Sequence, residues 1–221
     1  MISVLSEQST LYYAVKPMFM AILMLFHHKQ IHSKYSLFSI MIQAGLFFSW
    51  SGDIVLMLPD TTESLFIVGL GSFLIAHLGY SLGFYRTIKK SSYPFSYTKA
   101  ASYSLPFILV TGPFFYYIKD SLPSDLFFPA LGYSCVISAM GMFSAWRNGH
   151  VNQKTFSWIL AGAILFILSD CVLALNIFSI KPQQSSDMAK YLAILNMALY
   201  LTGQFMITVG AIYQIEPTNS K

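Results

Sequence analysis

Two aspartates stand inside long apolar segments of this chain. Asp53 lies in the apolar stretch 47–57, and Asp170 lies in the apolar stretch 166–174. A carboxylate at the centre of a membrane-spanning helix costs about 2.5–3.5 kcal/mol. Acids in such places therefore usually serve a function and face the interior of a helix bundle. If the two acids meet, their burial and mutual repulsion favour one protonated and one ionised group, as general acid–base hydrolysis requires.

Two other interpretations of these acids stay open from the residues alone. The carboxylates could relay protons or ions in a transporter. They could also be structural, with one aspartate paired with Lys16 and the other capping a broken helix. Lys16 itself could bind a phosphate group or anchor its helix at the membrane surface.

Further polar residues lie at helical spacing within the apolar runs. His77 and Tyr80 share a helix face, and Asn196, Tyr200 and Gln204 are spaced by four on a later helix. Such side chains could contact a substrate or join one helix to another. The candidate substrate-binding residues are Lys16, His77, Tyr80, Ser169, Asn196, Tyr200 and Gln204.

The histidines and cysteines do not indicate a metal site. His77 is the one histidine well inside an apolar run, so a zinc site with three histidines is not expected. Cys135 and Cys171 both fall in apolar runs, which indicates neither a disulfide nor a metal ligand set. The remaining histidines fall in or beside loops and are expected to be solvated: His27, His28, His32 and His150.

The composition indicates an integral membrane protein. Of the 221 residues, 55% are hydrophobic and 10% are charged, whereas soluble domains carry about 25% charged residues. The basic residues form no stripe, so nucleic-acid binding is not expected. Apolar runs long enough to span a membrane, about 20 residues each, cover 10–26, 35–58, 65–85, 98–118, 126–146, 156–178 and 189–213.

The predicted fold is therefore an all-α, polytopic transmembrane bundle of seven spans. It forms one domain, 1–221, with short tails at 1–9 and 214–221. Most lysines and arginines fall in alternate loops on one side, which predicts an outside N-terminus and a cytoplasmic C-terminus. We expect a multi-pass protein of the bacterial inner membrane. With about 1.5 Å of rise per residue, Asp53, Asp170 and Lys16 all lie in the outer half of the membrane.

Five short motifs follow one another in a fixed order. They are Lys16-Pro17, Ser51-Gly52-Asp53-x-x-Leu56, Gly71-x-Phe73-x-x-Ala76-His77-x-x-Tyr80, Phe166-x-x-Ser169-Asp170-x-x-Leu173-Ala174 and Tyr200-x-x-Gly203-Gln204. Together they resemble the YhhN-like lysoplasmalogenase family of multi-pass membrane proteins over most of the chain. Members of that family usually have an apolar helix before the Lys-Pro segment and eight spans, whereas seven are expected here.

The resemblance implies hydrolysis of the vinyl-ether bond of a lysoplasmalogen, a membrane lysophospholipid. The products would be a fatty aldehyde and glycerophosphoethanolamine or glycerophosphocholine. It also implies that Asp53 and Asp170 carry the reaction. Acid-catalysed cleavage of a vinyl ether requires no metal or cofactor, and we expect none. A vinyl ether is cleaved after its outer alkene carbon is protonated, and we expect Asp170, the deeper acid, to supply that proton and Asp53 to be the base. The alternative function is a proton-coupled lipid or small-molecule transporter that uses the same acids.

Overall fold

The computed structural model describes residues 9–31, 36–58, 63–179 and 186–215. Within these ranges the chain forms seven α-helices and no strand, which confirms the all-α prediction. The α-helices are α1 (Ser9–Ile31), α2 (Leu37–Leu56), α3 (Glu63–Lys90), α4 (Tyr97–Ile118), α5 (Phe127–Trp146), α6 (Gln153–Ala174) and α7 (Ser186–Ile215). Two 3₁₀ turns, η1 (Lys119–Ser121) and η2 (Ser124–Leu126), join α4 to α5, and a π-helical turn, η3 (Leu175–Ser179), follows α6.

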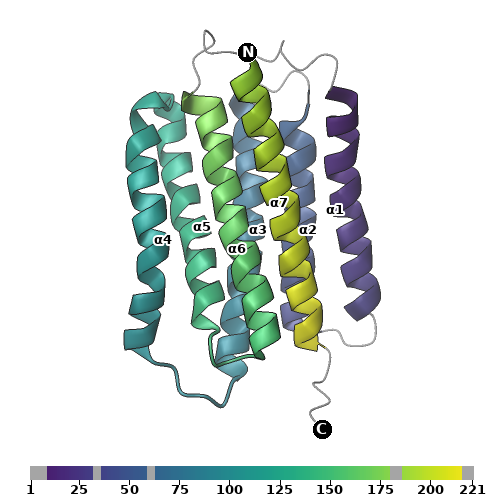
Figure 1. Cartoon of the computed structure of the whole chain (residues 1–221), viewed down its shortest axis with the longest axis vertical. Coiled ribbons are helices and arrows are strands. Elements are labelled where there is room, and N and C mark those ends of the chain that lie inside the picture. The colour runs from purple at the N-terminus through teal and green to yellow at the C-terminus, as the bar shows by residue number, and fades with distance from the viewer. Residues whose placement is uncertain (1–8, 32–35, 59–62, 180–185, 216–221) are drawn as a thin grey trace.

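The helices run side by side along one long axis (Figure 1). The most extensive contacts join α6 to α7 and α2 to α3, while α4 packs on α5 and α5 packs on α3. In Figure 1, α1 lies at one edge of the bundle and α4 at the other. We call the end at which α7 begins the upper end and the end at which α7 finishes the lower end, as they are drawn there.

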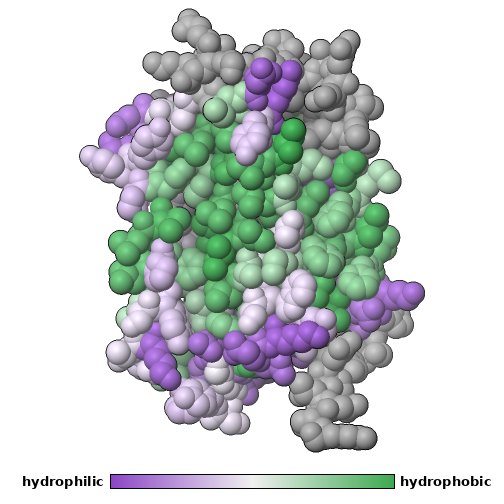
Figure 2. All heavy atoms as spheres, viewed as in Figure 1, coloured by the Kyte–Doolittle hydropathy of each residue, from purple (hydrophilic) through white to green (hydrophobic). Residues whose placement is uncertain are grey.

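The surface has the polarity of a membrane protein. Figure 2 shows a broad hydrophobic belt across the middle of the face in view, with hydrophilic side chains toward the lower end and again near the upper end. Five helices, α2, α3, α5, α6 and α7, are long and apolar enough to cross a membrane. Helices α1 and α4 have 23 and 22 residues and extend alongside them, about 33 Å in length. Polar residues such as Lys16 and Lys99 lower the hydropathy of these two helices.

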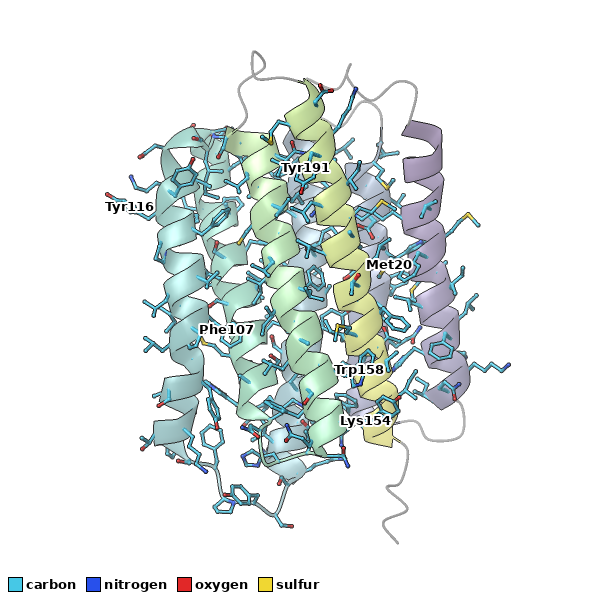
Figure 3. The ribbon with its side chains drawn as sticks, viewed as in Figure 1. Met20, Phe107, Tyr116, Lys154, Trp158 and Tyr191 are labelled. Atoms are coloured by element: carbon cyan, nitrogen blue, oxygen red, sulfur yellow. The ribbon has the colours of Figure 1, made fainter. Side chains whose placement is uncertain are left out.

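Aromatic and basic side chains mark the two ends of the belt (Figure 3). Tyr116 and Tyr191 are exposed toward the upper end, and Trp158 lies toward the lower end. Near Trp158, the Lys154 ammonium lies 3.7 Å from the ring centroid of Tyr213. Amphipathic aromatic and basic residues of this kind are enriched where a membrane meets water.

Close backbone contact between α6 and α7 depends on two glycines. A Cβ added to Gly162 would lie 2.7 Å from the carbonyl oxygen of Gly203, and a Cβ on Gly203 would lie 2.9 Å from that of Gly162. Small residues allow such close approach between membrane helices, where lipid offers no hydrophobic driving force for association. Gly203, expected from the sequence to permit close approach, therefore brings the polar side chains of α7 against α6.

The structure corrects the sequence analysis at one histidine. His27 was expected to be solvated, but its side chain is fully buried in α1, and its Nδ1 lies 2.7 Å from the Gln43 Oε1 of α2. Helix α1 continues to Ile31, five residues past the predicted end, and this extra turn places His27 inside the bundle. His28 is exposed as expected, and His32 lies outside the described residues.

The helix ends also differ slightly from the predicted limits of the tails. Ser9, placed in the N-terminal tail by the sequence analysis, belongs to α1. Gln214 and Ile215, placed in the C-terminal tail, belong to α7. The other residues of both predicted tails lie outside the described part of the chain.

Candidate active site

Asp53 lies in the last turn of α2 and is fully buried. The Lys16 Nζ of α1 lies 2.7 Å from its Oδ1, and the Tyr200 hydroxyl of α7 donates a 2.6 Å hydrogen bond to its Oδ2. The ring of Tyr200 also faces the ammonium, with its centroid 4.5 Å from Nζ. Both carboxylate oxygens thus have a partner, which is the condition under which a buried ionised aspartate is tolerated.

The position of Lys16 is fixed by its neighbour in the sequence. The Trp50 Nε1 donates a 3.1 Å hydrogen bond to the carbonyl oxygen of Pro17, which joins α1 to α2 beside the ion pair. On the other side of α2, a Cβ on Gly52 would lie 2.7 Å from the ring of Phe73. The Lys-Pro and Ser-Gly-Asp motifs therefore form one interface between α1, α2 and α3.

Asp170 lies near the upper end of α6, one turn before the π-helical turn η3. The Tyr133 hydroxyl of α5 donates a hydrogen bond to its Oδ2. The His77 Nε2 of α3 lies 2.9 Å from the Tyr133 oxygen and 3.8 Å from the Asp170 Oδ2. Since the single proton of Tyr133 points to Asp170, the Tyr133 oxygen accepts from the Nε2–H of His77. The result is a directed chain from His77 through Tyr133 to Asp170.

Phe166 lies between the two acid clusters. Its ring centroid is 5.3 Å from that of Tyr200, the partner of Asp53, and 4.7 Å from that of His77. The two carboxylates are nevertheless close enough to repel each other electrostatically. The site therefore holds two acids that interact through an apolar medium, each with its own set of hydrogen-bond donors.

The remaining sequence-predicted residues surround these clusters. The Tyr80 hydroxyl donates a 2.8 Å bond to the Gln204 Oε1, which joins α3 to α7. The Asn196 Nδ2 donates a 2.7 Å bond to the carbonyl oxygen of Ser169, which holds α7 against α6 beside Asp170. Both contacts join helices. Among the described residues, Tyr80, Gln204 and Asn196 make no hydrogen bond to either aspartate side chain.

The Ser169 hydroxyl lies between the carbonyl oxygen of Phe166 and the carboxyl group of Asp170. Its hydroxyl donates a 2.7 Å bond to the carbonyl oxygen of Phe166, and its oxygen lies 3.2 Å from the Asp170 Oδ1. With its proton on the Phe166 carbonyl, the Ser169 oxygen can accept a hydrogen bond from a protonated Asp170. The Asp170 Oδ2 meanwhile accepts from Tyr133, so the carboxyl group is held through one oxygen while its Oδ1 faces Ser169.

The order of burial differs from the sequence-based expectation. Asp170 was expected to be the more deeply buried acid, but 16% of its side chain is exposed, whereas the Asp53 side chain is 0% exposed. Position along the membrane normal does not decide burial here, because α1 and α7 cover Asp53 from the side through Lys16 and Tyr200. The acid and base roles therefore have to be inferred from the hydrogen-bond and ion-pair partners of each aspartate.

Sequence reasoning missed Tyr133, whose hydroxyl donates to Asp170. Tyr133 lies in an apolar run that contains no charged residue and none of the five motifs, so nothing in the sequence distinguished it. One available signal was depth. Tyr133 is six residues from the upper end of α5, about 9 Å, and this places it in the same layer as Asp170.

The described residues contain no group of three or more His, Cys, Asp or Glu side chains that could hold a metal ion. What the arrangement offers chemically is one carboxylate held beside an ammonium and a second carboxyl group that is partly accessible. Such a pair can deliver a proton and accept one within the same apolar site.

Comparison with known proteins identifies the chain's relatives. The sequence model of the YhhN family matches residues 11–211. The chain is similar to the human protein named lysoplasmalogenase TMEM86B, with 29% identity over 172 residues. This alignment covers 78% of the chain and 63% of the human protein, so the chain spans less than two thirds of the length of that relative. No solved structure matches the chain.

Proposed function

The chain belongs to the YhhN family, and from this premise we propose that it is a lysoplasmalogenase-like hydrolase. Its substrate would be a lysoplasmalogen, cleaved at the vinyl-ether bond to a fatty aldehyde and glycerophosphoethanolamine or glycerophosphocholine. The similarity to a protein named lysoplasmalogenase supports this substrate class. The observation that carries the proposal is the different setting of the two acids, the buried Asp53 beside an ammonium and the partly exposed Asp170 beside hydroxyl groups.

In the first step, Asp170 acts as the acid. Its carboxylic proton is transferred to the outer alkene carbon of the vinyl ether, and the electrons of the double bond form the new C–H bond. The carbon attached to oxygen becomes an oxocarbenium ion. Tyr133 and His77 support this role, because they hold the carboxyl group by its Oδ2 and leave Oδ1 to carry the proton.

In the second step, Asp53 acts as the base. Lys16 keeps this aspartate ionised, and its negative charge stabilises the cation nearby. Water adds to the oxocarbenium carbon and gives one proton to Asp53, which yields a hemiacetal. The hemiacetal collapses as its hydroxyl proton returns to Asp170 and the departing glycerol oxygen takes the proton from Asp53. One water is consumed, and both acids recover their starting states.

The position of Asp170 suits an amphiphilic substrate. Counted along α6 and η3, this residue lies about 13 Å below the end of η3 at the upper end of the bundle. A lysophospholipid places its headgroup at the membrane surface and its alkyl chain in the hydrocarbon. The vinyl ether, next to the glycerol, would then lie at the depth of the partly exposed carboxyl group.

The direct test uses the purified protein in detergent. It is incubated with a lysoplasmalogen and, separately, with the matched ester lysophospholipid, each with and without a chelator. The proposal expects aldehyde from the vinyl ether alone, at a rate that the chelator does not change. Absence of aldehyde would reject the hydrolase, and a proton-coupled carrier would show no turnover in detergent.

A further inference from the structure

A buried arginine lies at the lower end of the bundle, remote from the two acids. Arg147 directly follows α5, and its side chain is fully buried. Its Nε donates a 3.0 Å hydrogen bond to the Thr87 Oγ1 of α3, and its Nη2 donates a 2.9 Å bond to the Gln214 Oε1 of α7. The guanidinium therefore joins three helices where they end together.

The positive charge of Arg147 is not balanced by a carboxylate in the described part of the chain, where no ion pair includes it. Its Nη1 is buried and makes no hydrogen bond there. The rings of Phe84 and Phe38 lie 5.2 and 5.7 Å from the guanidinium carbon and supply partial compensation. Burial lowers the pKa of Arg147 to about 9, which still leaves the group charged at neutral pH. A buried cation with an unused donor is costly unless an anion approaches it.

A crevice of about 400 Å³ opens beside this arginine. Its wall contains Phe38, Thr87 and Gln214, and each of these three side chains also contacts Arg147. The guanidinium thus lies directly behind the wall of the crevice. Gln214 accepts from Arg147 and also lines the crevice, so its side chain is the layer between the guanidinium and a molecule bound there.

The other residues that line the crevice are suited to an anion. They are Ser36, Lys90, Ser91 and His150, which offer an ammonium, two hydroxyl groups and an imidazole. Burial lowers the pKa of His150, which disfavours the charged form of its ring. Ser36 is also the N-cap of α2, where backbone N–H groups and the helix dipole favour negative charge. Among the residues that the structure describes, none that lines the crevice carries a carboxylate.

We propose that this crevice binds a phosphate-bearing anion, which pairs with Lys90 and Arg147 at the N-terminus of α2. The ligand is a free phosphate group or the headgroup of an anionic phospholipid, since both present the same oxygens. The site is separate from the acids, because Ser36 and Asp53 lie at opposite ends of α2, about 25 Å apart. The proposal is therefore independent of the hydrolase activity.

The test is thermal unfolding of delipidated protein in detergent, at constant ionic strength. One arm adds inorganic phosphate, a second adds phosphatidylglycerol, and a third adds phosphatidylcholine at the same concentration. The unfolding midpoint of the wild type should rise by about 5 °C at saturation with an anionic probe. A rise with phosphate identifies a site for the free anion, and a rise with phosphatidylglycerol alone identifies a lipid headgroup site.

Variants test whether binding in the crevice causes the rise in the unfolding midpoint. Arg147→Gln and Lys90→Gln should each lose most of the rise, whereas Arg86→Gln should keep it. Arg86 is exposed on the same helix as Lys90 and does not line the crevice, so it controls for the loss of one charge. If Arg147→Gln does not fold, the comparison of Lys90→Gln with Arg86→Gln still tests the proposal, because Lys90 is exposed. An unchanged wild type, or equal rises in Lys90→Gln and Arg86→Gln, would overturn the proposal.

Discussion

Lys16 and Asp53 form a buried ion pair across the interface of α1 and α2, with Nζ 2.7 Å from Oδ1. One interpretation of Lys16 from the sequence was a phosphate-binding cation. In the structure its ammonium already contacts an anion of the protein itself, the Asp53 carboxylate. The structural alternative raised from the sequence, an aspartate paired with Lys16, is present in the fold. In our proposal this pair also has a chemical role, because it keeps Asp53 ionised for the second step.

The ion pair predicts strong coupling between its two members. Lys16→Met or Asp53→Asn alone should each cost about 3–5 kcal/mol of unfolding free energy, because each leaves a buried charge unpaired. The double variant should recover much of this loss, since both charges are then gone. Unfolding midpoints of the four proteins, completing a double-mutant cycle, measure the coupling.

An exposed pair provides the matched control for that cycle. Lys119 and Asp120 form a 2.8 Å pair near the upper end, with the Asp120 side chain 83% exposed. Lys119→Met should leave the unfolding midpoint unchanged, because water screens such pairs. Additive effects of Lys16→Met and Asp53→Asn would contradict the buried pair.

Tyr133→Phe tests the hydrogen-bond chain to Asp170. The substitution keeps the ring but removes the hydroxyl that holds the carboxyl group and contacts His77. We expect kcat to fall by about 10- to 100-fold with little change in KM, because the acid loses its orientation and not its substrate. Tyr116→Phe, at an exposed position of α4, should leave both constants unchanged. Equal kinetics in the two variants would remove Tyr133 from the mechanism.

Gly203→Ala tests the close packing that brings α7 against α6. The added methyl group would lie 2.9 Å from the Gly162 carbonyl oxygen, so we expect a loss of about 1–3 kcal/mol in stability. Gly132→Ala is the control, because nothing lies within 4 Å of a Cβ placed there. In that helix interior alanine should be neutral or stabilising. If both variants unfold at the same midpoint, the glycine contact does not limit the approach of the helices.

The helices could be predicted from the sequence because long apolar runs are sufficient to identify them. The aspartates also stood out, since a charge in such a run is conspicuous. Side-chain direction was less predictable. His27 was misjudged because its burial depends on an extra turn of α1 and on Gln43 of a second helix. Tyr133 was missed because nothing in the sequence sets this uncharged tyrosine apart from the others. Its contact with Asp170 is visible only in the folded structure.

The proposed protonation of carbon predicts an isotope label. When the reaction is run in heavy water and the aldehyde is trapped promptly, the product should carry one deuterium at its α-carbon. Mass spectrometry of the trapped aldehyde measures this number. Aldehyde without deuterium would show that the acid does not deliver its proton to the alkene.

Aldehyde release by Asp170→Asn tests the central claim most directly. This variant removes the proposed acid, but an amide can still accept from Tyr133 and donate to Ser169, so folding should be preserved in size-exclusion chromatography and circular dichroism. The account predicts that the wild-type protein hydrolyses a lysoplasmalogen and that the rate of aldehyde release falls at least about 1,000-fold in the variant. Turnover equal to the wild type in folded Asp170→Asn would contradict it.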